Sequence, residues 1–166
     1  MSLSVARRTA RQTGLAVREA RVVGSQHGYQ HLIIALPGGQ RAFAKVAAEQ
    51  EAVPAEMGAA FAAEASGLRW LAEAGAVPVP EVLAVTETAL VISMIPPGRP
   101  TPSAAFGFGA ELARLHAAGA ADFGAPWRGF IASLPLDNTP GPTASTAGWP
   151  QWYAQRIVEH FSAASE

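Results

Sequence analysis

Lys45 and Glu64 are the two side chains whose types and positions most clearly indicate chemistry in this sequence. Lys45 is the single lysine of the chain, and it ends a strand-like run of residues. A helix after that run would carry an apolar stripe made of Met57, Phe61, Leu68 and Leu71. Glu64 lies three, four or seven residues from each of these positions, and therefore within the stripe. Because an isolated carboxylate against a core is strongly unfavourable, we predict that Glu64 pairs with Lys45, and such a pair could hold a triphosphate.

The elements that must position this pair can be predicted from the pattern of apolar residues and glycines. Three strand-like runs separated by glycine-rich turns lie between Glu19 and Val46, which indicates an antiparallel meander. A helix that ends at Gly75 follows, and then two more strand-like runs at 81–85 and 89–95. We therefore predict an α+β fold with a five-stranded antiparallel sheet and one helix against it.

A strand lysine that faces a helix glutamate, in this order of elements, is the pair with which protein-kinase-type folds hold nucleotide phosphates. The turn between the first two strands would then cover the phosphates, and its candidate residues are Ser25, Gln26, His27 and Gly28. A turn that contains glycines also occurs without any ligand. The alternative for Lys45 and Glu64 is that they do not pair and that each side chain points separately into solvent.

The end of the fifth strand is the candidate hinge, where backbone N–H and C=O groups would hold adenine. Its residues are Ser93, Met94 and Ile95, and Met94 is equally well explained as a core residue. A proline- and glycine-rich stretch comes next, and Thr101 has the features of a helix N-cap with proline after it. We therefore divide the chain into a nucleotide-binding lobe (1–95), a linker (96–102) and the beginning of a truncated helical lobe (103–166).

Composition excludes several classes of function. The chain of 166 residues contains no cysteine, so disulfides and cysteine-bound metals are excluded. A formal net charge of −1 argues against nucleic-acid binding, which needs clustered cations. There is no apolar run long enough to cross a membrane and no secretory signal, so we expect a cytoplasmic protein. The second half is expected to be helical at both ends, with a loop-rich region from Gly119 to Gly148.

Six segments along the chain carry a family resemblance: FAKV, FAAEASGLRWLAEAGAVPVPEVLAV, LVISMIPPGRP, ELARLHAAGAADFG, GFIASLP and WPQWYAQRI. Together they resemble the fructosamine (ketosamine) kinase family, in the aminoglycoside-phosphotransferase and choline-kinase branch of the protein-kinase-like fold. The resemblance extends from about Glu19 to Phe161. It implies ATP-dependent phosphorylation of a sugar moiety on an amine, such as a glycated lysine or a small ketosamine. Lys45 would contact the α and β phosphates, and Glu64 would orient it.

The sequence also departs from the family pattern. A Ser-Ile-Asn-like stretch of the family is replaced by Ser25, Gln26 and His27, and an Asn-Phe-Ile-Gly-like run by Gly129, Phe130, Ile131 and Ala132. The family's His-Gly-Asp catalytic loop and later metal-binding aspartate have no counterpart here, so the ligands for Mg²⁺ are expected outside this chain. We therefore expect no catalytic residue in the chain, weak nucleotide binding at best, and no phosphoryl transfer.

Two other functions remain open from the sequence. One is a phosphotransferase of the same superfamily that acts on an aminoglycoside, choline or homoserine. The other is a nucleotide-binding module that does not catalyse a reaction.

Overall fold

A computed structural model of the chain describes residues 3–26, 28–48, 55–131, 134–142, 148–159 and 162. His27, which the sequence places in the phosphate-covering turn, lies outside these residues.

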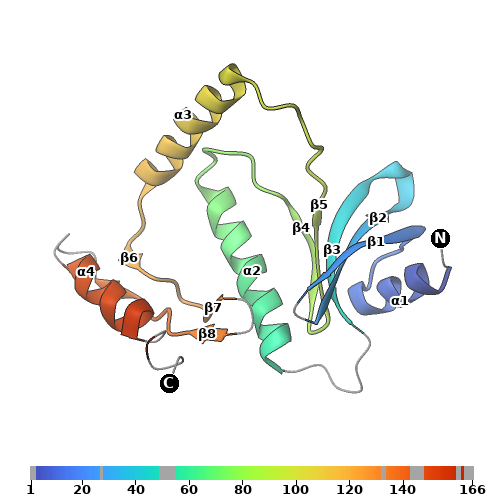
Figure 1. Ribbon diagram of the computed structural model, residues 1–166, viewed down its shortest axis with the longest axis horizontal. Coiled ribbons are helices and arrows are strands. Elements are labelled where there is room, and N and C mark those ends of the chain that lie inside the picture. The colour runs from blue at the N-terminus through green and yellow to red at the C-terminus, as the bar shows by residue number, and fades with distance from the viewer. Residues whose placement is uncertain are drawn as a thin grey trace.

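A five-stranded antiparallel sheet forms the body of the structure (Figure 1). Its strands are β1 (Glu19–Gln26), β2 (Tyr29–Ala35), β3 (Arg41–Ala47), β4 (Val82–Thr86) and β5 (Ala89–Ser93). They lie in the order β1-β2-β3-β5-β4, and every neighbouring pair is antiparallel. With α2 (Ala55–Glu73) beside the sheet, the predicted α+β fold is confirmed. A single turn of 3₁₀ helix, η1 (Pro37–Gly39), joins β2 to β3.

The register of the sheet determines the immediate neighbours of Lys45. Its cross-strand partner in β2 is His31, and its cross-strand partner in β5 is Leu90. Residues that are directly opposite in an antiparallel pair project from the same face. Lys45 therefore lies between an imidazole and a buried leucine on one face of the sheet.

Helix α1 (Leu3–Thr13) covers the other face of the sheet, and the sequence patterns did not predict it. Its buried positions include Thr9 and Thr13, whose hydroxyls donate to backbone carbonyls one turn earlier in the helix. Hydroxyls satisfied in this way take the place of apolar side chains on part of the buried face, so the helix contains few of the large apolar residues from which the other helices were predicted. At the end of the helix, the Gln12 amide donates to the Ala47 carbonyl at 3.1 Å, two residues beyond Lys45.

Helix α2 lies on the face of the sheet that carries Lys45. Its buried residues are Met57, Phe61 and Ala65, which pack against Ala47 and Leu90. The predicted stripe is therefore correct in its first half and wrong in its second, because Leu68 and Leu71 are only half-buried. Glu64 lies at the edge of the buried stripe and not within it.

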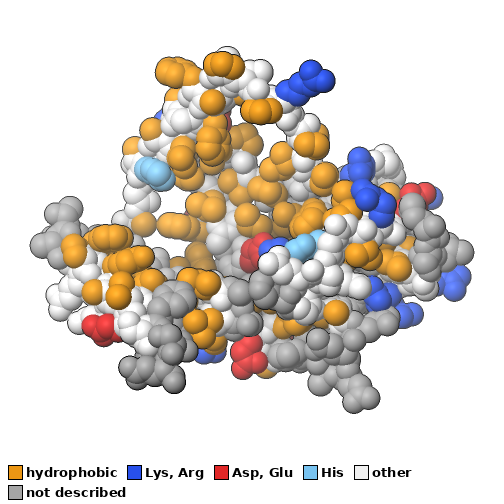
Figure 2. Space-filling view, in the orientation of Figure 1, with side chains coloured by type: hydrophobic (Ala, Val, Ile, Leu, Met, Phe, Trp, Pro, Cys, Tyr) orange, Lys and Arg blue, Asp and Glu red, His pale blue; other side chains and the backbone are white. Residues whose placement is uncertain are grey.

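Helix α3 (Pro102–Ala118) begins where the sequence predicted, because Thr101 accepts a hydrogen bond from the Ala104 amide at 3.1 Å. None of its residues is buried, although most are apolar, and Phe106 is 83% exposed. Figure 2 shows hydrophobic side chains along the visible face of this helix. A helix of this composition is normally enclosed by other elements.

The region expected to be loops contains two small antiparallel strand pairs. They are β6 (Asp122–Phe123) with β9 (Gly141–Pro142), and β7 (Gly129–Ile131) with β8 (Leu134–Leu136). Further along the chain come α4 (Gly148–Tyr153) and a π-helical turn, η2 (Ala154–Val158). Trp152 donates to the Thr139 carbonyl at 3.1 Å and lies so close to Gly124 and Gly141 that a Cβ at either position would overlap its ring. The Trp152 ring therefore packs against the pair β6 and β9, at positions where glycine leaves room for it.

Gly58 provides a test of how α2 is held on the sheet. A Cβ built at Gly58 would lie 3.0 Å from the Glu87 carbonyl oxygen and 3.1 Å from its Cα, whereas one at Gly67 would meet nothing within 4 Å. Gly67→Ala is expected to raise the free energy of unfolding by about 0.5–1 kcal/mol through helix propensity. Gly58→Ala is expected instead to lower the free energy of unfolding by roughly 1 kcal/mol or more, because overpacking against Glu87 outweighs the gain in helix propensity. Urea unfolding of both variants measures the difference, and equal stabilisation would show that α2 is not closely packed there.

Candidate functional site

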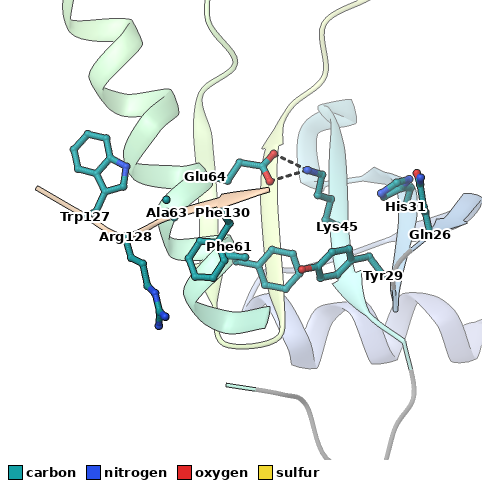
Figure 3. Close-up of a pocket in the computed structure, with 12 residues that line it drawn as sticks. Gln26, Tyr29, His31, Lys45, Phe61, Ala63, Glu64, Trp127, Arg128 and Phe130 are labelled. Carbon is teal, nitrogen blue, oxygen red and sulfur yellow. Dashed lines mark hydrogen bonds and ion pairs between the residues drawn. The ribbon is translucent and has the colours of Figure 1, made fainter. Parts of the chain in front are cut away.

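Lys45 and Glu64 form an ion pair between the sheet and α2. The Lys45 Nζ lies 2.7 Å from each of the two Glu64 carboxylate oxygens, as the dashed lines in Figure 3 mark. The structure thus brings together the two side chains that the sequence predicted to pair. The alternative in which each points separately into solvent is wrong.

Packing, and not the attraction between the two charges, determines this geometry. The Lys45 side chain is 30% exposed and that of Glu64 is 38% exposed. Ion pairs with this access to water contribute roughly 0–1 kcal/mol. Burial of a side chain such as Phe61, one turn before Glu64, contributes roughly 1.5–3 kcal/mol. Partial exposure also leaves the ammonium group accessible to a ligand.

A cavity of about 500 Å³ opens beside the ion pair. Three parts of the chain line it, and they are the sheet (Gln26, Tyr29, His31, Lys45), α2 (Ala60, Phe61, Ala63, Glu64) and the segment before and within β7 (Trp127, Arg128, Gly129, Phe130). Lys45 and Arg128 are the cations of this lining, and Glu64 is its carboxylate. Its formal charge is therefore positive, which favours an anionic ligand.

Arg128 does not face the ion pair. Its guanidinium carbon lies 5.8 Å from the centre of the Phe130 ring, and Figure 3 shows the side chain directed away from Glu64. The charges at the ion pair itself are therefore those of Lys45 and Glu64, which cancel formally, and an anionic ligand there would meet the exposed part of the Lys45 ammonium group.

Tyr29 lines the cavity at the start of β2, directly after the turn. Its ring contacts that of Phe61 with the ring centres 5.2 Å apart. Burial raises the pKa of the Tyr29 phenol above its usual value, and the negative charge of Glu64 raises it further. The tyrosine is therefore sensitive to the charge on Glu64.

The predicted phosphate-covering turn is placed partly at the cavity. Gln26 lines it, while the Ser25 hydroxyl donates to the Tyr29 carbonyl at 3.1 Å and thereby braces the turn. Gly28 has a φ of 78°, a backbone conformation that glycine adopts without strain. Ser25 and Gly28 therefore shape the turn, His27 lies outside the described part of the chain, and phosphate contacts by these residues stay a prediction.

The predicted hinge residues do not line this cavity. The Ser93 hydroxyl accepts from the Glu81 amide at 2.9 Å, and the Ser93 amide donates to the Glu81 carbonyl at 2.8 Å. The Met94 amide lies 3.3 Å from the Arg41 carbonyl, and Ile95 is exposed. These bonds fix the exit of β5, and they leave adenine contacts by residues 93–95 as a prediction.

Several residues of the cavity were missed from the sequence. His31 could have been found, because a tight turn at 37–40 sets the register that places it opposite Lys45. Tyr29 could have been found in the same way, as the first residue after the turn. No local pattern could have found the segment 127–130, which meets α2 from a distant part of the chain.

A second cluster lies away from the cavity and has a structural role. Asp137 accepts hydrogen bonds from the hydroxyl and the amide of Thr139, and it pairs with Arg156 of η2. These bonds lower the pKa of Asp137, those from Thr139 more than the pairing with Arg156. The pair fastens η2 to the chain after β8.

Neither a metal cluster nor a membrane span is found in the parts of the chain that the structure describes. No group of three or more histidine, aspartate or glutamate side chains there could hold a metal ion. The carboxylate that lines the cavity, Glu64, is engaged by Lys45. No helix among them has the length and hydrophobicity that a membrane crossing requires.

The antiparallel sheet, α2 and the ion pair between them define a lobe of the protein-kinase-like type, followed by the start of a helical region. The family model for fructosamine kinase matches residues 1–166, and the chain therefore belongs to the fructosamine kinase family. The fold is similar to a crystal structure of a candidate fructosamine-3-kinase from Thermobifida fusca YX-ER1, with a TM-score of 0.79 and 36% sequence identity. The match covers 94% of this chain but 51% of that one, so this chain spans about half its length. A search of curated proteins found no significant match.

The pKa of Tyr29 can be used to detect the charge of Glu64. The chain has two tyrosines, so Tyr153→Phe leaves Tyr29 as the only phenol to titrate. In that background, Glu64→Gln is expected to lower the pKa of Tyr29, because it removes a negative charge that disfavours the tyrosinate. Ultraviolet absorbance of tyrosinate during an alkaline titration measures the shift. Glu111→Gln, on α3, is the matched control, and an unchanged Tyr29 pKa in the Glu64→Gln variant would contradict the geometry.

Proposed function

We propose that this chain is the nucleotide-binding portion of an ATP-dependent small-molecule kinase of the fructosamine kinase type. The observation that carries the proposal is the contact of Lys45 with both carboxylate oxygens of Glu64 beside an open cavity. A lysine fixed in this way presents an ammonium group to the α and β phosphates, while the glutamate holds its direction.

The proposed division of labour follows the order of the elements. Residues 1–95 form the nucleotide-binding lobe, 96–102 a hinge, and 103–166 the beginning of the helical lobe. Within the first lobe, the turn of Ser25, Gln26, His27 and Gly28 covers the phosphates. Backbone groups of Ser93, Met94 and Ile95 hold adenine. The Ser93 and Met94 amides already donate to Glu81 and Arg41, which holds the exit of β5 in place, so the proposed adenine contacts are assigned to the other backbone groups of these three residues.

We propose that the phosphate acceptor is a sugar moiety on an amine, either a glycated lysine or a small ketosamine. Support comes from the family to which the chain belongs and from the name of the similar crystal structure. We also propose that the protein acts in the cytoplasm, where ATP is abundant. Comparison of purified ketosamine, aminoglycoside, choline and homoserine acceptors, in a protein that spans the full family length, would separate the related phosphotransferases.

We propose that these residues bind nucleotide without transferring phosphate. Phosphoryl transfer needs a carboxylate that orients the acceptor and carboxylates that hold Mg²⁺. The described residues contain no such metal-binding group, and this chain spans about half of the similar structure. We therefore propose that the acceptor-orienting and Mg²⁺-binding carboxylates belong to the half of the family-length protein that this chain does not span.

Lys45→Ala is expected to weaken ATP binding by about 10- to 100-fold, the loss that follows removal of a charged hydrogen-bond donor. Isothermal titration of the chain with ATP in excess Mg²⁺ measures the dissociation constant. Lys45→Arg keeps the charge but changes its geometry, so it should bind with intermediate affinity. Arg114→Ala, which removes a cation from exposed α3, is the control for net charge.

ATP binding that is the same for the unaltered chain and for Lys45→Ala would overturn the proposed function. A phosphorylation assay of the unaltered chain with ATP and a ketosamine is expected to show no turnover. Measurable turnover would contradict the proposal that the transferring groups lie elsewhere.

A further inference from the structure

Helix α2 is contacted from two directions, by the sheet and by the segment that includes β7. Figure 1 shows α2 between the sheet and the hairpin formed by β7 and β8. Cα atoms of α2 and β7 approach within 8 Å of one another. The hairpin follows α3 in sequence, and the expected division of the chain assigns it to the second lobe. An element of the proposed second lobe thus lies against the helix that carries Glu64.

Two tryptophans form the clearest contact in this region. The ring of Trp127 meets that of Trp70 edge to face, with the ring centres 6.3 Å apart and the planes at 68°. This geometry is favourable between aromatic rings. Next to it, Gly129 and Phe130 line the same cavity as Ala63 of α2. The segment 127–130 and the part of α2 around Glu64 therefore border the same cavity.

Complete burial against the sheet is confined to the first part of α2. The buried residues of the helix are Met57, Phe61 and Ala65, whereas none from residue 66 to residue 73 is buried. Trp70 lies in this second part and is 43% exposed. The ion pair is too accessible to water to hold the helix in place. The contact with Trp127 is a side-chain contact that supports the second part of α2 from the segment before the hairpin.

We propose that Trp127 is a positioning residue that acts through Trp70 and α2 on Glu64. It holds the helix where the Lys45–Glu64 pair is formed before nucleotide binds, so the second lobe contributes to phosphate binding without touching the phosphates. This inference rests on the proposed function, in which that pair holds the nucleotide.

ATP binding in a double-mutant cycle tests the inference. Trp127→Ala is expected to weaken ATP binding about fivefold or more when Glu64 is present, the lower end of typical coupling between sites. Combined with Glu64→Gln, it should change binding less than about twofold, because there is then no carboxylate to position. Trp127→Phe keeps an aromatic ring and is expected to restore most of the affinity. Trp149→Ala removes an exposed tryptophan that is stacked on Tyr153, and it should have no effect.

Amide hydrogen exchange provides a readout that needs no nucleotide. Trp127→Ala is expected to speed exchange at residues 66–73 about tenfold, through local opening, and to leave β2 and β3 unchanged. Unchanged exchange in α2 would overturn the inference, and so would a loss of ATP affinity that is the same with Glu64 intact and in the Glu64→Gln background. General loss of protection in β2 and β3 would also overturn it, because Trp127 would then support the whole fold.

The two proposals fail in different ways. ATP binding that depends on Lys45 but not on Trp127 overturns the role of Trp127 alone. ATP binding that does not depend on Lys45 overturns the proposed function together with that role.

Discussion

Packing of α2 against the sheet is the constraint on which the candidate site depends. Phe61, which is almost completely buried, fixes the helix against Leu90 and Ala47, and Glu64 follows one turn later. Its carboxylate consequently meets Lys45, which the register of three strands holds on the same face of the sheet. The charges themselves contribute little to stability at this exposure, so the ion pair is a result of the fold more than a cause of it. This arrangement suits a binding site, since a pair that is not needed for stability can exchange its contacts with a ligand.

Contacts from several distant parts of the chain converge on this one sheet and helix. Helix α1 covers the opposite face, and Gln12 bonds to the backbone of β3 just after Lys45. The Thr86 hydroxyl donates to the Gln12 carbonyl at 2.7 Å, which links the same helix to the end of β4. On the other side, the hairpin of β7 and β8 approaches α2, and Trp152 holds the short strands β6 and β9 together. Segments that follow residue 102 are therefore part of the surroundings of the ion pair. Helix α3, by contrast, has no buried residue and extends away from the body of the structure (Figure 1).

Membership of the fructosamine kinase family gives this geometry its chemical context. The cavity offers an accessible cation, a carboxylate that orients it, and aromatic walls. It does not offer a cluster of metal ligands among the described residues. Holding a phosphate and transferring it are separate tasks that need different groups. The proposed function assigns the first of them to this arrangement.

The sequence by itself determined the order of the strands and α2 along the chain, the N-cap at Thr101, and the pairing of Lys45 with Glu64. These features follow from local patterns, since strands alternate and helices repeat every 3.6 residues, so that a glutamate beside the apolar stripe of the helix lies near the face of the sheet that carries Lys45. Helix α1 escaped prediction because threonines bonded to their own helix occupy part of its buried face. Only the tertiary structure placed Glu64 at the edge of the stripe, left residues 93–95 outside the cavity, and brought Trp127 to Trp70. Those contacts join residues that are far apart in the chain, and no local pattern records which distant surfaces will meet when the chain folds.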